Sequence, residues 1–365
     1  MIFLQRWRRR ASLKLFSVFC FLCPFLLSGC AVWAPLGVRA VADREALPAE
    51  IAAYYDYPRQ PAVVEVLREE RTRDYILRTI EFPLSLPADL VPPDLDTIKA
   101  HVQEISDHDK KTAGDTKLIY TNRVDLYVPT GLKPGEKRPG ILISPILGGN
   151  MVVDHFARYY AGRGYVAAIV YRKKPFLRDD FTDMSGIEDY MRTCILRLRQ
   201  ALDWFETVPE VDPDRIGSFG VSYGAVLHSI LSAVEPRIQY HILAMPAGPL
   251  PEVIMHCPDA GIFKLVKKAR EHGWSDERIY EDLKEKIRTD PVLLAPWIPK
   301  EKIQVYVALF DRVVGAGRSF YLWKAMDRPS LKILPFGHYG GILVFPLLET
   351  QSHLAFRKHL KAVKS

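Results

Sequence analysis

The stretch Gly220-Val221-Ser222-Tyr223-Gly224 decides the expected fold of this 365-residue sequence, because it matches the pattern G-x-S-x-G. Residues 215–219 before it have the composition of a short buried strand, and residues 225–231 after it favour a helix. Glycines two residues before and after Ser222 let the backbone turn sharply without a steric clash. A serine on such a turn is held exposed at the end of a sheet, as a nucleophile requires. The alternative is a chance turn in which Ser222 only caps the following helix.

A serine hydroxyl attacks a substrate only when a base removes its proton and a carboxylate orients that base. The sequence has ten histidines, and His338 has the best position among them. It follows the strand-like segment 331–334 and lies in the glycine-rich stretch 337–341, which can present an imidazole without blocking a substrate. The other histidines fall upstream of the serine, within helices, in the middle of a strand or in the segment 249–299. We therefore predict that His338 is the general base, the alternative being a loop histidine with no role.

The orienting carboxylate is expected between Ser222 and His338, at the C-terminal end of another strand. Asp311 comes just after the apolar run 303–309, so it is placed where it can accept a hydrogen bond from the imidazole and fix its tautomer. Asp327 is the alternative, but it precedes a proline-containing turn in which a local role explains it. Asp311 is therefore the predicted acid.

Short apolar segments alternate with amphipathic helical segments from residue 140 onward. This pattern predicts an α/β fold with a mostly parallel central sheet and helices on both faces. Two earlier stretches, 75–82 and 118–128, are also rich in β-forming residues. The expected strands of this sheet are 140–143, 165–171, 215–219, 238–245, 303–309 and 331–334, and the main expected helices are 151–163 and 186–208.

Residues 249–299 interrupt this alternation with about 50 residues of helical character and high charge. An insertion between two strands downstream of the nucleophile would lie over the strand ends as a cap, and its length favours that interpretation. The alternative is an ordinary solvated helical crossover. We predict a helical cap at about residues 250–300.

From about residue 139 to 345 the sequence resembles the α/β-hydrolase family, in particular its esterases and dienelactone-hydrolase-like members. Three segments carry the resemblance in the family's order: 220–224 for the nucleophile, 310–314 for the acid and 337–340 for the histidine. Residues 211–216 also resemble the family's lead-in to the nucleophile strand. The resemblance implies an α/β-hydrolase domain over residues 71–365.

Acyl transfer also needs two N–H groups that hold the charged oxygen of the tetrahedral intermediate. One is the backbone N–H of Tyr223, the residue after the nucleophile. The other comes from the loop at 144–150, where alignment with the family's His-Gly-x-Gly-Gly pattern implies Leu147 as the donor. The chain has Pro-Ile-Leu-Gly-Gly instead and so departs from the family here, although a backbone N–H does not depend on its side chain.

The first 29 residues resemble a bacterial lipoprotein signal peptide. Basic residues up to Lys14 precede the apolar run 15–27, and Leu27-Ser28-Gly29-Cys30 matches a lipobox. The resemblance implies cleavage before Cys30, a mature N-terminus there that is anchored by acyl chains such as palmitate, and residues 30–70 as a tether and N-terminal extension outside the cytoplasm. Alanine after the cysteine favours the outer membrane. An uncleaved transmembrane helix is the alternative, because no charge occurs between Lys14 and Arg39.

Charge and cysteine content exclude other classes of protein. The formal charge of +7 falls to +2 without the first 29 residues, which carry five positive and no negative charges, so nucleic-acid binding is not expected. Of the five cysteines, Cys194 and Cys257 remain beyond the lipobox, and a disulfide between them is permitted but not favoured. No cysteine or histidine spacing suggests a metal site, and no cofactor is expected.

These features predict a membrane-anchored, extracytoplasmic serine hydrolase that cleaves a small-molecule carboxylic ester through an acyl-enzyme. The same residues would also serve an acyltransferase, a thioesterase or a peptidase. A non-catalytic lipoprotein that keeps the fold as a binding module is a further alternative. The sequence predicts neither the natural substrate nor the oligomeric state.

Overall fold

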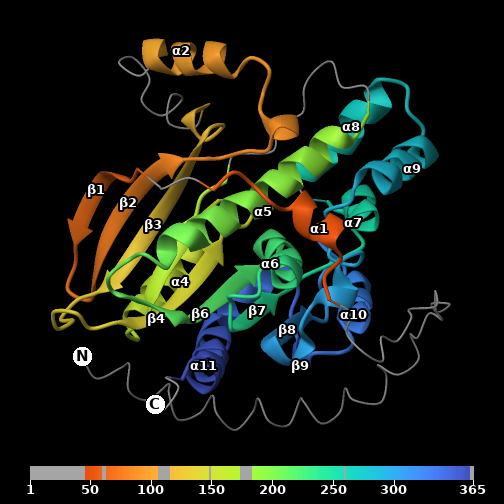
Figure 1. Cartoon of the computed structure of the whole chain (residues 1–365). Coiled ribbons are helices and arrows are strands. Elements are labelled where there is room, and N and C mark those ends of the chain that lie inside the picture. Colours follow the sequence, from red (N-terminus) through yellow and green to blue (C-terminus); the bar gives the residue numbers. More distant parts are fainter. Residues whose placement is uncertain are drawn as a thin grey trace, which may run out of the picture. The chain divides into compact units, whose positions relative to one another are not determined.

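The computed structural model describes residues 46–59, 63–105, 116–147, 149–172, 183–258 and 260–361. Its strands form one mixed sheet in the order β1-β2-β3-β5-β4-β6-β7-β8-β9, with helices on both faces (Figure 1). The predicted α/β class is confirmed. The strands are β1 Glu65–Arg71, β2 Tyr75–Pro83, β3 Thr121–Pro129, β4 Arg138–Ser144, β5 Val166–Val170, β6 Val211–Val221, β7 Tyr240–Ala244, β8 Ile303–Ala308 and β9 Ser330–Leu334.

The helices connect these strands and fill the insertion. The α-helices are α1 Ala49–Tyr54, α2 Leu95–Ile105, α4 Met151–Ala161, α5 Ser185–Phe205, α6 Tyr223–Val234, α7 Leu250–His256, α8 Ala260–Glu271, α9 Asp276–Lys286, α10 Ala316–Ala325 and α11 Gly341–His359. Short 3-10 turns are η1 Ala88–Leu90, η2 Ala295–Trp297, η3 Lys300–Lys302 and η4 His338–Gly340.

The sheet is parallel from β5 to β9 and antiparallel from β1 to β5. All six strands predicted from residue 140 onward lie in the parallel part. Their register brings the carboxyl ends together, with Val221 of β6 opposite Ala244 of β7 and Ala308 of β8 opposite Leu334 of β9. Residues that follow these strands therefore meet along one edge of the sheet.

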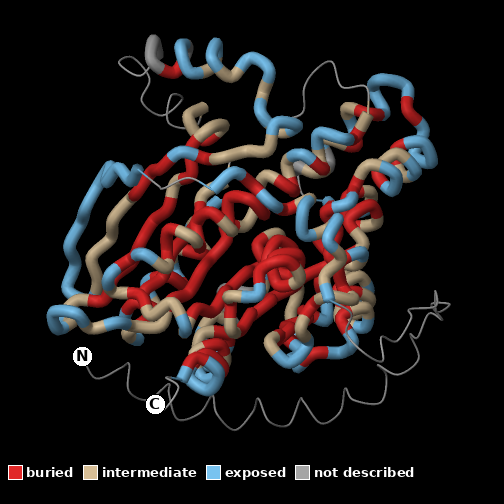
Figure 2. Tube along the Cα trace, in the orientation of Figure 1, coloured by how far each residue is buried: buried red, intermediate tan, exposed pale blue. Residues whose placement is uncertain are grey.

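Consecutive residues of the central strands face opposite sides of the sheet, which gives it two buried faces. Ile141 and Ile143 pack with side chains of α4 and α11, whereas Leu142 between them packs with side chains of α5 and α6. The strands β7 and β8 also contact α10 on the side of α6. Figure 2 shows this central layer as continuously buried, while β1 at the edge is exposed along its length.

The folded unit includes α1 and β1, which lie before the expected start of the domain at residue 71. Tyr55 is buried just after α1, and its hydroxyl donates to Thr289 Oγ1 at 3.0 Å. Tyr57 likewise donates to Asp203 at 2.7 Å. The N-terminal extension thus packs on α5 and on the segment that leaves α9.

The structure does not describe the predicted N-terminal signal, but it does describe the two cysteines of the predicted mature chain. The signal peptide, the lipobox and Cys30 lie outside the described residues. Within the described ranges, no helix is both long and apolar enough to cross a membrane. Cys194 and Cys257 are both buried, and no disulfide joins them in this structure.

Candidate active site

Ser222 lies at the junction between β6 and α6, with φ 55° and ψ −121°. A positive φ is costly for a residue with a side chain, so the surrounding structure must hold this turn in place. The Ser222 N–H donates to the Ala244 carbonyl at 2.8 Å, which ties the turn to the end of β7. The sharp strand-to-helix turn is the conformation that the sequence predicted.

The two glycines of the motif are required by close backbone approaches. A Cβ on Gly220 would lie 2.4 Å from the Gly224 carbonyl oxygen, and one on Gly224 would lie 2.6 Å from the Ser144 carbonyl oxygen. Real Cβ atoms do not come this close to backbone atoms. The glycines therefore let the turn pack directly against the end of β4.

The side chains of Ser222, His338 and Asp311 form a continuous chain of hydrogen bonds. His338 Nε2 lies 3.0 Å from Ser222 Oγ, and Nδ1 lies 2.8 Å from Asp311 Oδ2. Because an ionised carboxylate only accepts hydrogen bonds, Nδ1–H donates to Asp311 and Nε2 is left to accept the serine proton. Asp311 comes shortly after β8, and His338 begins the turn η4 after β9, so both meet the serine at the carboxyl edge.

Asp311 is buried and held in its charged form. Burial alone would raise the pKa of this carboxyl. The hydrogen bond and charge of His338, together with the N–H groups of Val313 and Val314 that donate to Oδ1, outweigh burial and lower the pKa. The carboxylate is therefore ionised at neutral pH and able to stabilise an imidazolium.

The structure does not bring the alternative acid to this site. Asp327 follows α10 and forms an ion pair with Lys300. Of the other histidines, His228 and His241 are fully buried in α6 and β7. His241 Nδ1 contacts Ser218 Oγ at 2.8 Å, away from the serine turn.

Comparison with solved structures identifies the fold. An acetyl xylan esterase from Paenibacillus sp. R4 superposes with a TM-score of 0.60 at 14% identity, over 85% of this chain and 93% of that one. Acetyl xylan esterase 1 from Thermoanaerobacterium sp. JW/SL YS485 gives 0.59 at 15% identity, over 84% and 94%. The fold is that of the α/β-hydrolases. No protein-family model and no curated protein matches the sequence.

In the α/β-hydrolase fold the oxyanion donors come from the residue after the nucleophile and from the loop after an earlier strand. Tyr223 is the first residue of α6, so its N–H has no acceptor within the helix. Leu147 lies in the loop after β4, where Ile146 and Gly149 form an isolated bridge. The donor role of the Leu147 N–H stays a prediction.

Sequence reasoning missed one side chain at this edge of the α/β-hydrolase sheet. Arg172 comes just after β5, and its Nη2 donates to the carbonyls of Ile146 at 2.7 Å and Leu147 at 3.0 Å. Its Nη1 donates to the Tyr190 hydroxyl at 2.9 Å, and its guanidinium carbon lies 5.2 Å from the centre of the Tyr223 ring. Arg172 thus contacts both segments that carry the predicted oxyanion donors. Its position directly after a buried strand is the sequence signal that could have identified Arg172.

The inserted helices contact the loop of the predicted acid. Val253 of α7 and Cys257 are buried together with Val313 and Val314, the residues whose N–H groups bind Asp311, and Ile262 of α8 packs against them. The insertion therefore contacts the loop that holds the carboxylate. Its role as a cap over a bound substrate stays a prediction.

The described part of the chain contains no cluster of three or more metal-binding side chains. The arrangement at the sheet edge is one of a serine, an imidazole and a carboxylate. It is chemically suited to nucleophilic attack on an acyl carbon.

Proposed function

We propose that this protein is a serine esterase that hydrolyses a carboxylic ester through an acyl-enzyme. One observation carries the proposal: Ser222, His338 and Asp311 form a hydrogen-bonded chain at the carboxyl edge of an α/β-hydrolase sheet. The strained backbone of the serine and the lowered pKa of Asp311 support it, because both are properties of a site prepared for reaction.

The geometry supports a two-stage reaction. Ser222 Oγ attacks the ester carbonyl carbon while His338 Nε2 takes the hydroxyl proton, and the carbonyl electron pair moves to the oxygen. The N–H groups of Tyr223 and Leu147 hold this oxyanion. Collapse of the intermediate breaks the bond to the alkoxide, which leaves with the proton from Nε2. Water then attacks the acyl-enzyme by the same route, releasing the acid and restoring Ser222.

Asp311 acts through the imidazole. Its Oδ2 holds the Nδ1–H tautomer and stabilises the positive charge that His338 gains in each stage. The His338 side chain is only 11% exposed, so it is oriented by its surroundings while its Nε2 faces the serine.

Covalent labelling tests the nucleophile. A fluorophosphonate probe should label the full chain, and Ser222→Ala should abolish both labelling and hydrolysis of p-nitrophenyl acetate. Ser330→Ala is the matched control, because Ser330 is exposed in β9. Labelling that persists in Ser222→Ala would refute the assignment.

Acetyl esters are the first substrates to test, since two structures with this fold are acetyl xylan esterases.

We propose that the insertion α7–α9 sets acyl-chain preference, because it contacts the loop of the acid. Rates for p-nitrophenyl esters of two, four and eight carbons measure that preference. Higher kcat/KM for a matched thioester or amide would assign the alternative thioesterase or peptidase activity, and transfer to an added alcohol would assign acyl transfer.

We further propose that the enzyme is held at a membrane by a lipid on Cys30, outside the cytoplasm. The support is the lipobox at residues 27–30 after a basic and apolar leader. Cys30→Ser should leave the chain uncleaved and without incorporated palmitate. Unchanged processing would favour an uncleaved transmembrane anchor instead.

A further inference from the structure

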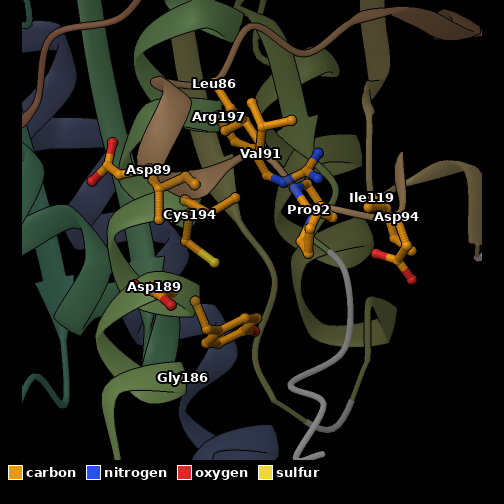
Figure 3. Close-up of a pocket in the computed structure, with 14 residues that line it drawn as sticks. Leu86, Asp89, Val91, Pro92, Asp94, Ile119, Gly186, Asp189, Cys194 and Arg197 are labelled. Atoms are coloured by element: carbon orange, nitrogen blue, oxygen red, sulfur yellow. The ribbon is translucent and has the colours of Figure 1, made fainter. Parts of the chain in front are cut away.

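A pocket of about 330 Å³ lies apart from the catalytic hydrogen bonds, between the N-terminal half of α5 and the segment 86–94 (Figure 3). This volume is in the range of sites for small organic ligands. The pocket is open to solvent and has walls of mixed character. Its apolar lining includes Leu86, Leu90, Val91, Pro92 and Ile119.

Three carboxylates line the same pocket, and they differ in their partners. Asp89 forms an ion pair with Arg192. Among the residues that the structure describes, no cationic side chain forms an ion pair with Asp94 or Asp189. The charge of Arg192 also acts on Asp189, but it offsets burial and the charge of Glu188 only in part.

Arg197 also lines the pocket but does not neutralise these acids. Its side chain is buried, and its Nη1 and Nη2 donate to the carbonyls of Thr121 and Leu118. Its hydrogen-bond donors are thus directed to the backbone at the start of β3. Burial and then the charge of Glu188 raise the pKa of Asp189, and the nearby charge of Arg192 lowers it only in part, so a further cation beside that carboxylate would stabilise its charged form.

We propose that this pocket binds a small organic ammonium ion, with its charge against Asp189 and the Tyr190 ring and its apolar substituents against the wall formed by segment 86–92. An ammonium ion supplies a positive charge beside Asp189 and Asp94, which form no ion pair among the described residues, whereas a neutral polyol does not. The aromatic ring of Tyr190 adds a cation–π surface next to the carboxylate. Apolar walls favour an alkylated ion over a hydrated metal ion.

The occupant would influence the catalytic edge through one side chain. Tyr190 lines the pocket, accepts the hydrogen bond from Arg172 Nη1 and stacks on Tyr223 with ring centres 6.3 Å apart. Arg172 in turn holds the carbonyls of the loop after β4. Contact with Tyr190 would therefore fix the side chains that position both predicted oxyanion donors. This coupling rests on the proposed esterase function, but binding itself does not.

Binding is tested on the full chain carrying Ser222→Ala, by titration calorimetry at low salt. Choline is the probe, and 3,3-dimethylbutan-1-ol is its neutral analogue of the same shape. Choline should bind at least fivefold more tightly than the alcohol, and Asp189→Asn should weaken it about fivefold, the loss expected for a partly exposed charge pair. Asp96→Asn is the matched control, because Asp96 lies in the first turn of α2 outside the pocket lining. Equal affinity for the alcohol, or equal losses in both variants, would overturn the proposal.

Coupling is tested separately on the active enzyme. Choline should raise kcat for p-nitrophenyl acetate at least twofold in the wild type and not in Asp189→Asn. A bound probe that leaves kcat unchanged would refute the coupling while the binding result stands. An enzyme with no hydrolysis at all would refute the proposed function instead, and the calorimetry would still decide the binding site.

Discussion

Arg172 donates a hydrogen bond from Nη2 to the backbone carbonyl of Leu147, at 3.0 Å, although the two residues follow different strands of the sheet, β5 and β4. The same nitrogen reaches the Ile146 carbonyl at 2.7 Å. A guanidinium is planar and presents its donors in fixed directions, so these two bonds restrain the peptide groups of the loop. The direction of the Leu147 N–H is set by this same stretch of backbone.

Arg172→Met should therefore lower kcat for ester hydrolysis while leaving KM nearly unchanged. Complete loss of an oxyanion donor costs about 10²–10³ in kcat, so loss of a residue that positions one should cost about tenfold. Steady-state kinetics measure the effects on kcat and KM separately. Arg172→Lys should recover activity only partly, since an ammonium lacks the planar, forked set of donors of a guanidinium.

Arg163→Met is the control for this prediction. Arg163 is an exposed arginine whose guanidinium carbon lies 4.7 Å from the centre of the Tyr159 ring. The positioning role of Arg172 would be ruled out by equal kinetic effects in the two variants, or by a loss of kcat that matches a loss of folded protein.

Asp311→Asn should reduce kcat by about 10⁴ without unfolding the protein, because an amide beside Nδ1 no longer enforces the tautomer that leaves Nε2 free to accept. Circular dichroism checks the fold and hydrolysis rates give the loss. Asp327→Asn changes the alternative acid, which is paired with Lys300, and should leave kcat within about twofold of wild type. The reverse pattern would assign the acid to Asp327.

The three side chains of the candidate site were predictable because each follows a strand of recognisable pattern. Apolar runs ending near Val221, Ala308 and Leu334 belong to parallel strands, and the carboxyl ends of parallel strands lie along one edge. Ser222, Asp311 and His338 each follow one of those strand ends closely. The sequence alone therefore predicted that the three side chains lie together. The sheet itself was predictable for the same reason.

The features that the sequence analysis missed are defined by tertiary contacts or lack a pattern in the sequence. The bond between Arg172 and Tyr190 joins the end of a strand to the face of a helix, and no spacing in the sequence encodes it. The strand β1 was missed because all of its residues are exposed, so its sequence has no buried face to produce an alternating pattern.

Gly224→Ala should destabilise the protein and distort the serine turn, because the added Cβ would lie 2.6 Å from the Ser144 carbonyl oxygen. Overpacking of this kind costs about 1–3 kcal/mol, and here the clash is with backbone that cannot rotate away. Urea denaturation gives the loss of stability, and fluorophosphonate labelling reports the turn.

Gly317→Ala supplies the contrast within the same chain. Gly317 lies in α10 with no atom within 4 Å of a Cβ placed there, so alanine should stabilise the helix by about 0.5–1 kcal/mol. A Gly224→Ala protein as stable and as reactive as wild type would show that the turn relaxes more easily than its geometry implies.

His228 should make the protein sensitive to acid well above the pH at which most carboxylates titrate. Its ring is fully buried, neither ring nitrogen has a hydrogen-bond partner in the described part of the chain, and burial lowers its pKa to about 3. The unfolded chain binds a proton at this residue below about pH 6.5 and the folded chain does not. Stability is therefore lost as the pH falls from about 6.5 toward 3, by up to about 1.4 kcal/mol per pH unit.

His228→Leu should flatten this dependence, since leucine cannot take up the proton in the unfolded chain. His241 is also buried with a lowered pKa, so the variant should keep roughly half of the slope between pH 6 and pH 4. Urea midpoints at several pH values measure it. His256→Leu, at an exposed position at the end of α7, is the matched histidine-to-leucine control. If His228→Leu and wild type lose stability in parallel below pH 6, the His228 ring takes up a proton in the folded protein and burial does not hold it neutral.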